Sequence, residues 1–453
     1  MTQSRITRTM SANDSTDAQR SGRPTFADLE TIFRVISHPK YRETCETLCD
    51  FLARSRTERE NPDALLHLQV DMASLLLSLQ RAKRRFEARA EDSSASEDLR
   101  TGALLAAATM RRLHHLVRQI GDGIAWRSFD YDRAALYQLA RKPPTGHIEA
   151  VSTQKEVDKA GVHAANGTCV LINDLTNFVR FADLTIFRDE AISFEEVKGG
   201  EGSRKSGHAS RQANKLKAMT EFINTKRRQT SIGSECLVRV KTAPRTHLPA
   251  LLELIKIARR QGHAHARLSD CLAVDVYHVE TAAAISVGRR SMLEIAHNPF
   301  SQSRKAIRGH SLDLFYHFTP NRAPYTVFPW PDEDCSDVLS GAIWIVSYLN
   351  WGKVERTLKK RHLVVGDLDR ARLSQFLLRP IGEQKLRTFD VGLSVGRPNW
   401  APCKVSFVDL ARISYEFLDE EAFADTIEEV LEIGIPPGEL YFTAFENEAL
   451  IWD

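Results

Sequence analysis

Two acidic residues and one lysine in the middle of the chain have the types and spacing that phosphodiester hydrolysis needs. Asp183 begins one apolar stretch, and Glu196 and Lys198 lie two residues apart at the end of the next one. Carboxylates bind hard divalent cations, which lower the pKa of a bound water and neutralise charge on a phosphate. A neighbouring ammonium group can orient that water. We therefore predict that Asp183 and Glu196 bind Mg²⁺ or Mn²⁺ and that Lys198 orients the attacking water.

Three short strands must position these residues. Residues 169–172, 183–187 and 192–198 are apolar stretches with strand-like composition, and the connections between them are short. Alternation along a strand places Glu196 and Lys198 on one face. If the second and third strands pair as an antiparallel hairpin, Asp183 at the start of one lies beside Glu196 at the end of the other. The sequence therefore predicts a three-stranded meander with the site at one end.

This pattern resembles the PD-(D/E)xK nuclease superfamily, which has the restriction-endonuclease-like fold. Asp183, Glu196 and Lys198 match the family's Asp, acidic residue and lysine, although Ala182 stands where the family motif has proline. Gln212, near the start of a predicted helix, matches a polar position that faces the site in several branches. The resemblance covers about residues 148–276. It implies a mixed-sheet core, a Mg²⁺ or Mn²⁺ cofactor and a catalytic set of Asp183, Glu196, Lys198 and Gln212.

Other residues near the motif leave alternatives open. Many family members carry a further Glu on a helix before the first strand, and Glu149 and Glu156 both stand there. Asp174 follows the first strand and is interpreted as a turn residue, with a further site acid as the alternative. His163 and His208 are interpreted as exposed loop residues, with phosphate contact as the alternative.

The Glu-x-Lys triplet has little specificity alone, because the chain contains a second one at 383–385. That second triplet follows Arg379, Pro380 and Gly382, has no apolar strand before it, and lacks a strand-borne Asp at a suitable distance. The triplet at Glu196, by contrast, has an apolar strand before it and a strand-borne Asp, Asp183, at a suitable distance. An ion pair on an exposed sheet face remains the structural alternative for Glu196 and Lys198.

Local charge also favours a nucleic-acid partner, with DNA preferred over RNA. The net charge of the whole chain is only +3, but residues 198–228 contain many bases and only two acids. Such bases contact phosphates without reading sequence. We predict nucleic-acid contacts by Arg204, Lys205, Arg211 and Lys215.

Four regions are expected. They are a disordered tail (1–24), a helical domain with a long helical hairpin (25–141), the nuclease-like domain (142–280), and a C-terminal α/β region with an acidic end (281–453). The fold class is thus multidomain α+β or α/β. Within it we expect helices from residue 62 to about 85, from 97 to 120 (ending before Gly121), from 210 to 228, from 248 to 261 and near 341–349. The acidic end is interpreted as a solvated face, with shielding of a basic groove as the alternative.

Several other classes of protein are excluded or disfavoured. The seven cysteines are odd in number and form no C-x-x-C pair, which disfavours a disulfide framework or a zinc finger. P-loop, G-x-S-x-G and H-E-x-x-H motifs are absent. No apolar run is long enough for a bilayer and no secretory signal is present, so we expect a cytoplasmic protein without a membrane partner.

The sequence thus predicts a metal-dependent nuclease. By analogy with large multidomain members of the superfamily, it would act as a bacterial defence effector against phage or mobile DNA. Two other hypotheses stay open: an inactive nucleic-acid-binding or scaffold protein with a nuclease-like fold, and a nuclease for DNA repair or junction processing. The helical N-terminal region or the C-terminal region would offer a surface for a protein partner or a second copy.

Overall fold

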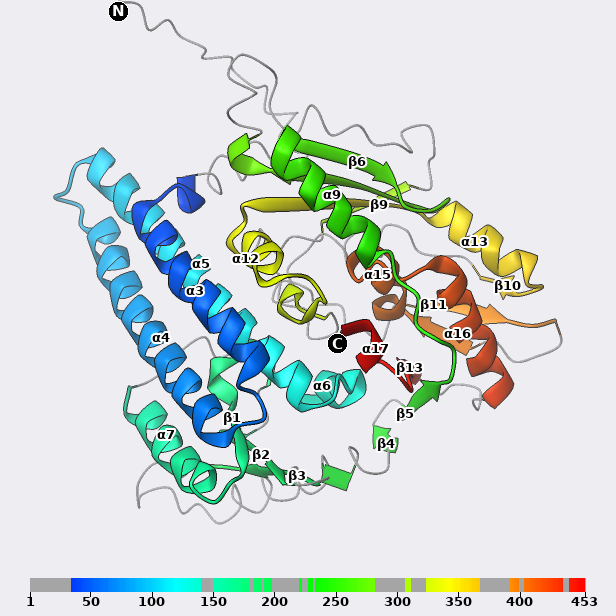
Figure 1. The fold of residues 1–453 in the computed structure, drawn as a ribbon, viewed down its shortest axis with the longest axis horizontal. Coiled ribbons are helices and arrows are strands. Elements are labelled where there is room, and N and C mark those ends of the chain that lie inside the picture. Colours follow the sequence, from blue (N-terminus) through cyan, green and yellow to red (C-terminus); the bar gives the residue numbers. More distant parts are fainter. Residues whose placement is uncertain are drawn as a thin grey trace, which may run out of the picture.

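The structure is a computed structural model with mixed α-helices and β-sheets (Figure 1). It describes residues 34–139, 148, 150–179, 182–188, 191–197, 220–221, 227–230, 233–281, 306–310, 323–366, 392–398, 403–434 and 440–452. The expected tail, 1–24, lies outside these residues. Within them, no helix combines the length and the apolar character that crossing a membrane requires.

The first part of the chain is a layer of long helices. It contains α3 (Pro39–Thr57), α4 (Pro62–Glu91), α5 (Glu97–Ser128) and α6 (Arg133–Leu139). The Asn61 side chain accepts hydrogen bonds from two backbone N–H groups at the start of α4, and the Ser96 hydroxyl oxygen accepts one from the N–H of Leu99 at the start of α5. A five-residue connection turns the chain back, so α4 and α5 lie side by side as the predicted helical hairpin (Figure 1).

Both helices are longer than predicted, and α5 runs straight through its glycines. Gly121 and Gly123 were expected to end the helix, but they lie inside it. A Cβ atom on Gly121 would be 2.2 Å from the carbonyl oxygen of Leu175, and one on Gly123 would be 2.3 Å from the Thr326 hydroxyl oxygen. The two glycines therefore allow close packing against other segments rather than a turn.

Replacing Gly121 with alanine is expected to lower the free energy of unfolding by about 1–3 kcal/mol, because the new methyl group collides with backbone. Gly102→Ala is the matched control in the same helix: its Cβ would meet nothing within 4 Å. Alanine is the better helix former, so this variant should be stabilised by up to about 1 kcal/mol. Urea unfolding followed by circular dichroism measures both. Equal effects at the two positions would contradict the packing role of Gly121.

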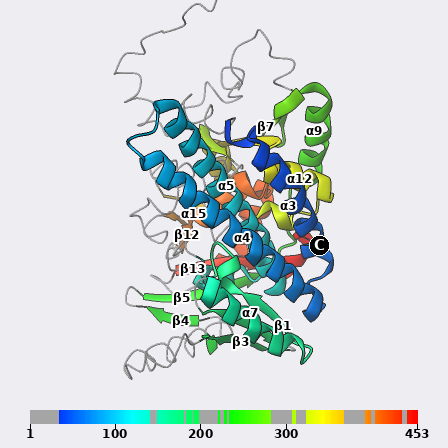
Figure 2. The same ribbon diagram turned by 90° about the vertical axis from the view of Figure 1, so that its left-hand side faces the viewer.

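A small antiparallel sheet lies at one end of this helical layer (Figure 2). Its three strands have the order β1 (Cys169–Ile172), β2 (Leu184–Arg188), β3 (Ala191–Glu195). Helix α7 (Ala150–Ala164) precedes the sheet in the chain, and the 3₁₀ turn η1 (Asn173–Leu175) follows β1. Helices α4 and α7 pack against β1. The predicted meander is confirmed, although β3 ends at Glu195 rather than at Lys198.

Two further sheets contain the remaining strands. The six-stranded sheet has the order β10 (Val364–Val365), β11 (Gly392–Gly396), β12 (Cys403–Ser406), β13 (Leu440–Phe445), β5 (Gly233–Val240), β4 (Arg227–Thr230). The four-stranded antiparallel sheet has the order β6 (His263–Arg267), β7 (Leu272–His278), β9 (Ile343–Asn350), β8 (Ala306–His310). Strands from 142–280 and from 281–453 pair within both sheets, so the expected division at residue 280 runs through them.

Helices cover these sheets and connect their strands. They are α9 (Leu248–Gln261), the 3₁₀ turn η2 (Tyr325–Val327), α12 (Asp332–Ser340), α13 (Trp351–Lys360), α15 (Phe407–Tyr415), α16 (Glu420–Ile433) and α17 (Ala449–Trp452). The prediction of a helix at 248–261 is confirmed.

Two predicted helices are wrong over at least part of their length. Residues 343–350 form β9, in which every residue is buried. A central strand with two covered faces is apolar throughout, so it shows no alternation that would separate it from a buried helix. Arg227 and Arg228, expected at a helix end, belong to β4 and pair with β5.

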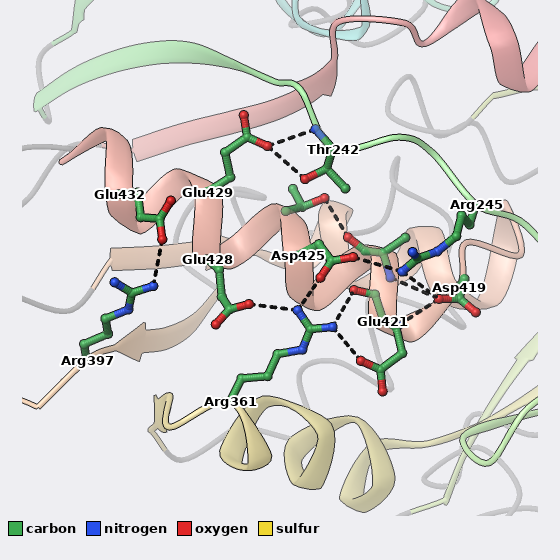
Figure 3. Close-up of polar contacts among 12 residues, drawn as sticks. Thr242, Arg245, Arg361, Arg397, Asp419, Glu421, Asp425, Glu428, Glu429 and Glu432 are labelled. Atoms are coloured by element: carbon green, nitrogen blue, oxygen red, sulfur yellow. Dashed lines mark hydrogen bonds and ion pairs between the residues drawn. The ribbon is translucent and has the colours of Figure 1, made fainter.

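The acidic end of the chain is an integral part of the fold. Helix α16 carries a row of carboxylates that bind arginines from other segments (Figure 3). Arg361 contacts Glu421 at 2.6 Å, Glu428 at 2.8 Å, and also Asp425. Several carboxylates of this acidic end are thus paired with arginines within the chain, although Glu421 and Glu432 remain largely exposed.

Candidate acidic site

The antiparallel register brings the predicted carboxylates together. Leu184 pairs with Glu195, and the backbone N–H of Asp183 donates to the Glu195 carbonyl at 3.2 Å. This bond is one residue out of the β2–β3 register, so regular pairing ends here, but Glu196 still lies close enough for its charge to raise the pKa of Asp183. The Asp183 carboxylate accepts a hydrogen bond from the backbone N–H of Val197 at 2.6 Å, which holds it at the end of β3. The predicted juxtaposition of Asp183 and Glu196 is therefore present.

Two further acids lie beside this pair. Glu156 on α7 is only 3% exposed. Burial, together with the charges of Asp174 and Asp183, raises its pKa to about 8. We call Glu156, Asp174, Asp183 and Glu196 the acidic cluster. Of the two upstream glutamates left open by the sequence, Glu156 is the one in the cluster, and Glu149 lies outside the described residues.

Asp183 is perturbed in the same sense. Burial is the largest cause that raises its pKa to about 6, and the charges of Glu196 and Asp174 add to the rise, while the Val197 hydrogen bond opposes it. Carboxylates that raise one another's pKa favour either a shared proton or a bound cation. Strong perturbation of this kind is typical of functional sites.

Buried amide side chains hold the strands that carry the cluster. Gln69 on α4 accepts from the N–H of Ile172 and donates to the carbonyl of Val170, both at 2.7 Å, so it satisfies the outer edge of β1. Asn173 donates to the carbonyl of Ala182 at 2.9 Å and accepts from the Thr185 hydroxyl at 2.8 Å. The start of β2, and with it Asp183, is thereby fixed against the end of β1.

Helix α7 also binds the neighbouring glutamate, Glu195, but in a different way. The Glu195 carboxylate contacts His163 Nε2 at 2.8 Å and Lys159 Nζ at 3.0 Å. Burial raises the pKa of Glu195, but these hydrogen bonds outweigh it and hold the pKa below its ordinary value. Glu195 therefore has a structural ion pair, whereas Glu196 belongs to the acidic cluster. His163, interpreted as a loop residue, lies on α7 and is mostly buried.

The cluster offers hard oxygen ligands, which Mg²⁺ and Mn²⁺ prefer. Three direct ligands of one ion must have their ligand atoms close together, and no three carboxylates of the acidic cluster, whose members the structure all describes, lie within 4.8 Å of one another. Within the described residues, the three-residue group whose ligand atoms all lie within 4.8 Å of one another is His247, Asp419 and Glu420. Mg²⁺ is usually bound by one or two carboxylates together with water and substrate phosphate, so Asp183 and Glu196 are the residues of the cluster that could hold such an ion.

The other predicted site residues lie outside the described part of the chain. They are Lys198 and Gln212 of the catalytic set and Arg204, Lys205, Arg211 and Lys215 of the nucleic-acid-binding set. Their roles stay predictions.

Comparisons with protein-family models, with curated proteins and with solved structures found no match to this chain.

Proposed function

We propose that the protein is a metal-dependent nuclease that hydrolyses phosphodiester bonds, with DNA as the favoured substrate. The observation that supports it most is the convergence of four acids from separate elements: Glu156 from α7, Asp174 from η1, Asp183 from the start of β2, and Glu196 from the end of β3. A helix with a buried Glu before an antiparallel hairpin with Asp and Glu is the arrangement that the sequence resemblance to the PD-(D/E)xK superfamily leads us to expect, and the sequence supplies Lys198 two residues after Glu196.

Each residue of the proposed site would have its own role in hydrolysis. Asp183 and Glu196 would hold Mg²⁺ or Mn²⁺, with Val197 N–H fixing the Asp183 carboxylate. When bound, the ion would supply a water of lowered pKa and neutralise charge on the phosphate. Lys198 would orient that water, and Gln212 would assist it. Glu156 would adjust the charge of the site, because its pKa of about 8 lets it keep a proton until a cation arrives.

A cleavage assay tests this proposal. The full chain is incubated with Mg²⁺ or Mn²⁺ and with single-stranded, duplex and branched DNA and RNA. We expect cleavage that EDTA abolishes and that Asp183→Asn, Glu196→Gln and Lys198→Ala each remove. Glu195→Gln is the matched control, because Glu195 is adjacent in sequence but binds His163 and Lys159.

Three outcomes distinguish the hypotheses. If the wild-type chain cleaves nothing with either metal but binds nucleic acid, the scaffold hypothesis replaces ours. If cleavage is confined to branched DNA, the junction-processing hypothesis gains support. If cleavage persists in Asp183→Asn and Glu196→Gln, the acidic cluster is not the active site.

A further inference from the structure

A second group of potential ligands lies away from the acidic cluster, where the connection between β5 and α9 meets the start of α16. It consists of His247, Asp419 and Glu420, whose ligand atoms all lie within 4.8 Å of one another. His247 Nε2 is 3.8 Å from Asp419 Oδ2 and 3.8 Å from Glu420 Oε2. An imidazole nitrogen thus faces two carboxylate oxygens.

The backbone fixes this arrangement. Thr246 and Leu418 form an isolated antiparallel bridge. On either side of it, the N–H of His247 donates to the Phe417 carbonyl at 2.8 Å, and the N–H of Asp419 donates to the Arg245 carbonyl at 2.9 Å. Figure 3 shows Arg245 and Asp419 meeting at the start of α16. The relative position of His247 and Asp419 is therefore determined by main-chain hydrogen bonds rather than by flexible side chains.

Helix capping explains only part of the group. Acids are favourable at a helix N-terminus, and Asp419 Oδ1 accepts from the N–H groups of Glu421 and Ala422 at 2.9 and 3.0 Å. That cap uses Oδ1 and leaves Oδ2 facing His247. It does not account for Glu420, which is only 7% exposed and directs Oε2 toward the same imidazole.

Two buried atoms of the group have no hydrogen-bond partner within the described residues: His247 Nε2 and Glu420 Oε2. A buried polar atom without a partner destabilises the folded chain, because nothing replaces the water that it loses on burial. These two atoms face each other, yet 3.8 Å is too long for a hydrogen bond. A cation between them would satisfy both atoms, together with Asp419 Oδ2.

We propose that His247, Asp419 and Glu420 bind a divalent transition metal of the Zn²⁺ class. One nitrogen and two carboxylate oxygens suit zinc, and ligands about 2.1 Å from a tetrahedral ion lie about 3.4 Å apart. The 3.8 Å spacings need only a small closure. The cap on Oδ1 orients Asp419 as an outer-shell hydrogen bond would. The ion would join the β5–α9 connection to α16 and keep a fourth position for water.

Zinc titration of the metal-stripped Asp183→Asn chain tests the proposal, since that background removes one carboxylate of the acidic cluster. Calorimetry should give one equivalent of bound Zn²⁺, and Zn²⁺ should raise Tm. Glu420→Gln and His247→Gln should each weaken binding by at least about tenfold, the lower end of what loss of even an outer-shell partner costs. His265→Gln is the control: its imidazole contacts Asp275 at 2.8 Å, outside the proposed site.

Either of two results would overturn the site. One is the absence of stoichiometric Zn²⁺ binding to the folded Asp183→Asn chain. The other is equal affinity in His247→Gln, Glu420→Gln and the His265→Gln control. His247 and Glu420 would then form an ion pair at most. Circular dichroism of each metal-free variant shows whether it is folded, so loss of binding through unfolding is recognised separately.

Discussion

Replacing Arg133 with methionine is expected to lower the free energy of unfolding by about 3–5 kcal/mol. Arg133 binds both oxygens of Glu416, at 2.7 and 2.8 Å, and Glu448 at 3.1 Å. Arg412 binds the same two glutamates, at 2.9 and 2.7 Å. All four side chains are at most 4% exposed, and their charges balance. Removing one arginine leaves a buried carboxylate that its remaining partner cannot neutralise.

Two comparisons make this prediction specific. Lys256→Met removes an exposed pair with Glu253 and should change stability by less than about 1 kcal/mol. Adding Glu448→Gln to Arg133→Met restores charge balance, so the double variant should be less destabilised than the sum of the singles. Chemical unfolding measures the wild-type chain and the four variants, which include Glu448→Gln alone. A loss for Arg133→Met no larger than for Lys256→Met would contradict the role of the network.

The same network should depend on pH. Burial raises the pKa of Glu416, but the charges of Arg133 and Arg412 outweigh it and hold the pKa below its ordinary value. A depressed pKa contributes stability that is present above the pKa of the unfolded chain, about 4.3, and is lost as pH falls through the folded value. The difference between wild type and Arg133→Met should therefore narrow below about pH 4.

Glu156→Gln is expected to have opposite effects on stability and on metal binding. In EDTA at pH 8.5 the variant should be more stable than wild type by on the order of 2 kcal/mol, because it removes a buried charge beside Asp174 and Asp183. With saturating Mn²⁺ the wild-type chain should gain more stability than the variant, since the ion binds the folded cluster.

The sign follows from the raised pKa. The protonated form of Glu156 contributes stability fully below about pH 4, the unfolded pKa, and this contribution is lost as pH rises through about 8. Glutamine cannot ionise, so the advantage of the variant should grow between these limits. Asp158→Asn, at an exposed position of the same helix, should show no such trend. If Mn²⁺ raises the stability of the wild-type chain and of Glu156→Gln equally, Glu156 does not contribute to metal binding.

Local pattern predicted much of this molecule. The helix predicted to begin at residue 62 and the apolar strand at 169–172 depend on neighbouring residues alone, and both are present in the helical hairpin and the meander. The juxtaposition of Asp183 and Glu196 also followed, because a short hairpin has few possible registers. Glu156 is one of the two upstream glutamates that the sequence offers; the structure places it, buried on α7, beside Asp174 and Asp183, while Glu149 lies outside the described residues.

Long-range pairing was beyond the same reasoning. Nothing local to residues 343–350 distinguishes a strand buried on both faces from a helix. The sequence predicts a helix end at Gly121 because glycine is a poor helix former. It gives no information on the carbonyl of Leu175, which lies so close that only glycine fits. The group of His247, Asp419 and Glu420 was missed for a similar reason, since an isolated bridge between Thr246 and Leu418 brings together segments far apart in the chain.

The position of β13 has a consequence for biosynthesis. This strand enters the middle of the six-stranded sheet, in parallel pairing with β5 on one side and β12 on the other. A ribosome releases β5 long before β13, so the sheet exists as two unjoined halves for much of translation. Each half then exposes an unpaired inner edge, which is a template for aggregation. Slow synthesis or chaperone binding during that interval should therefore affect the yield of folded chain more than mutations on the finished surface.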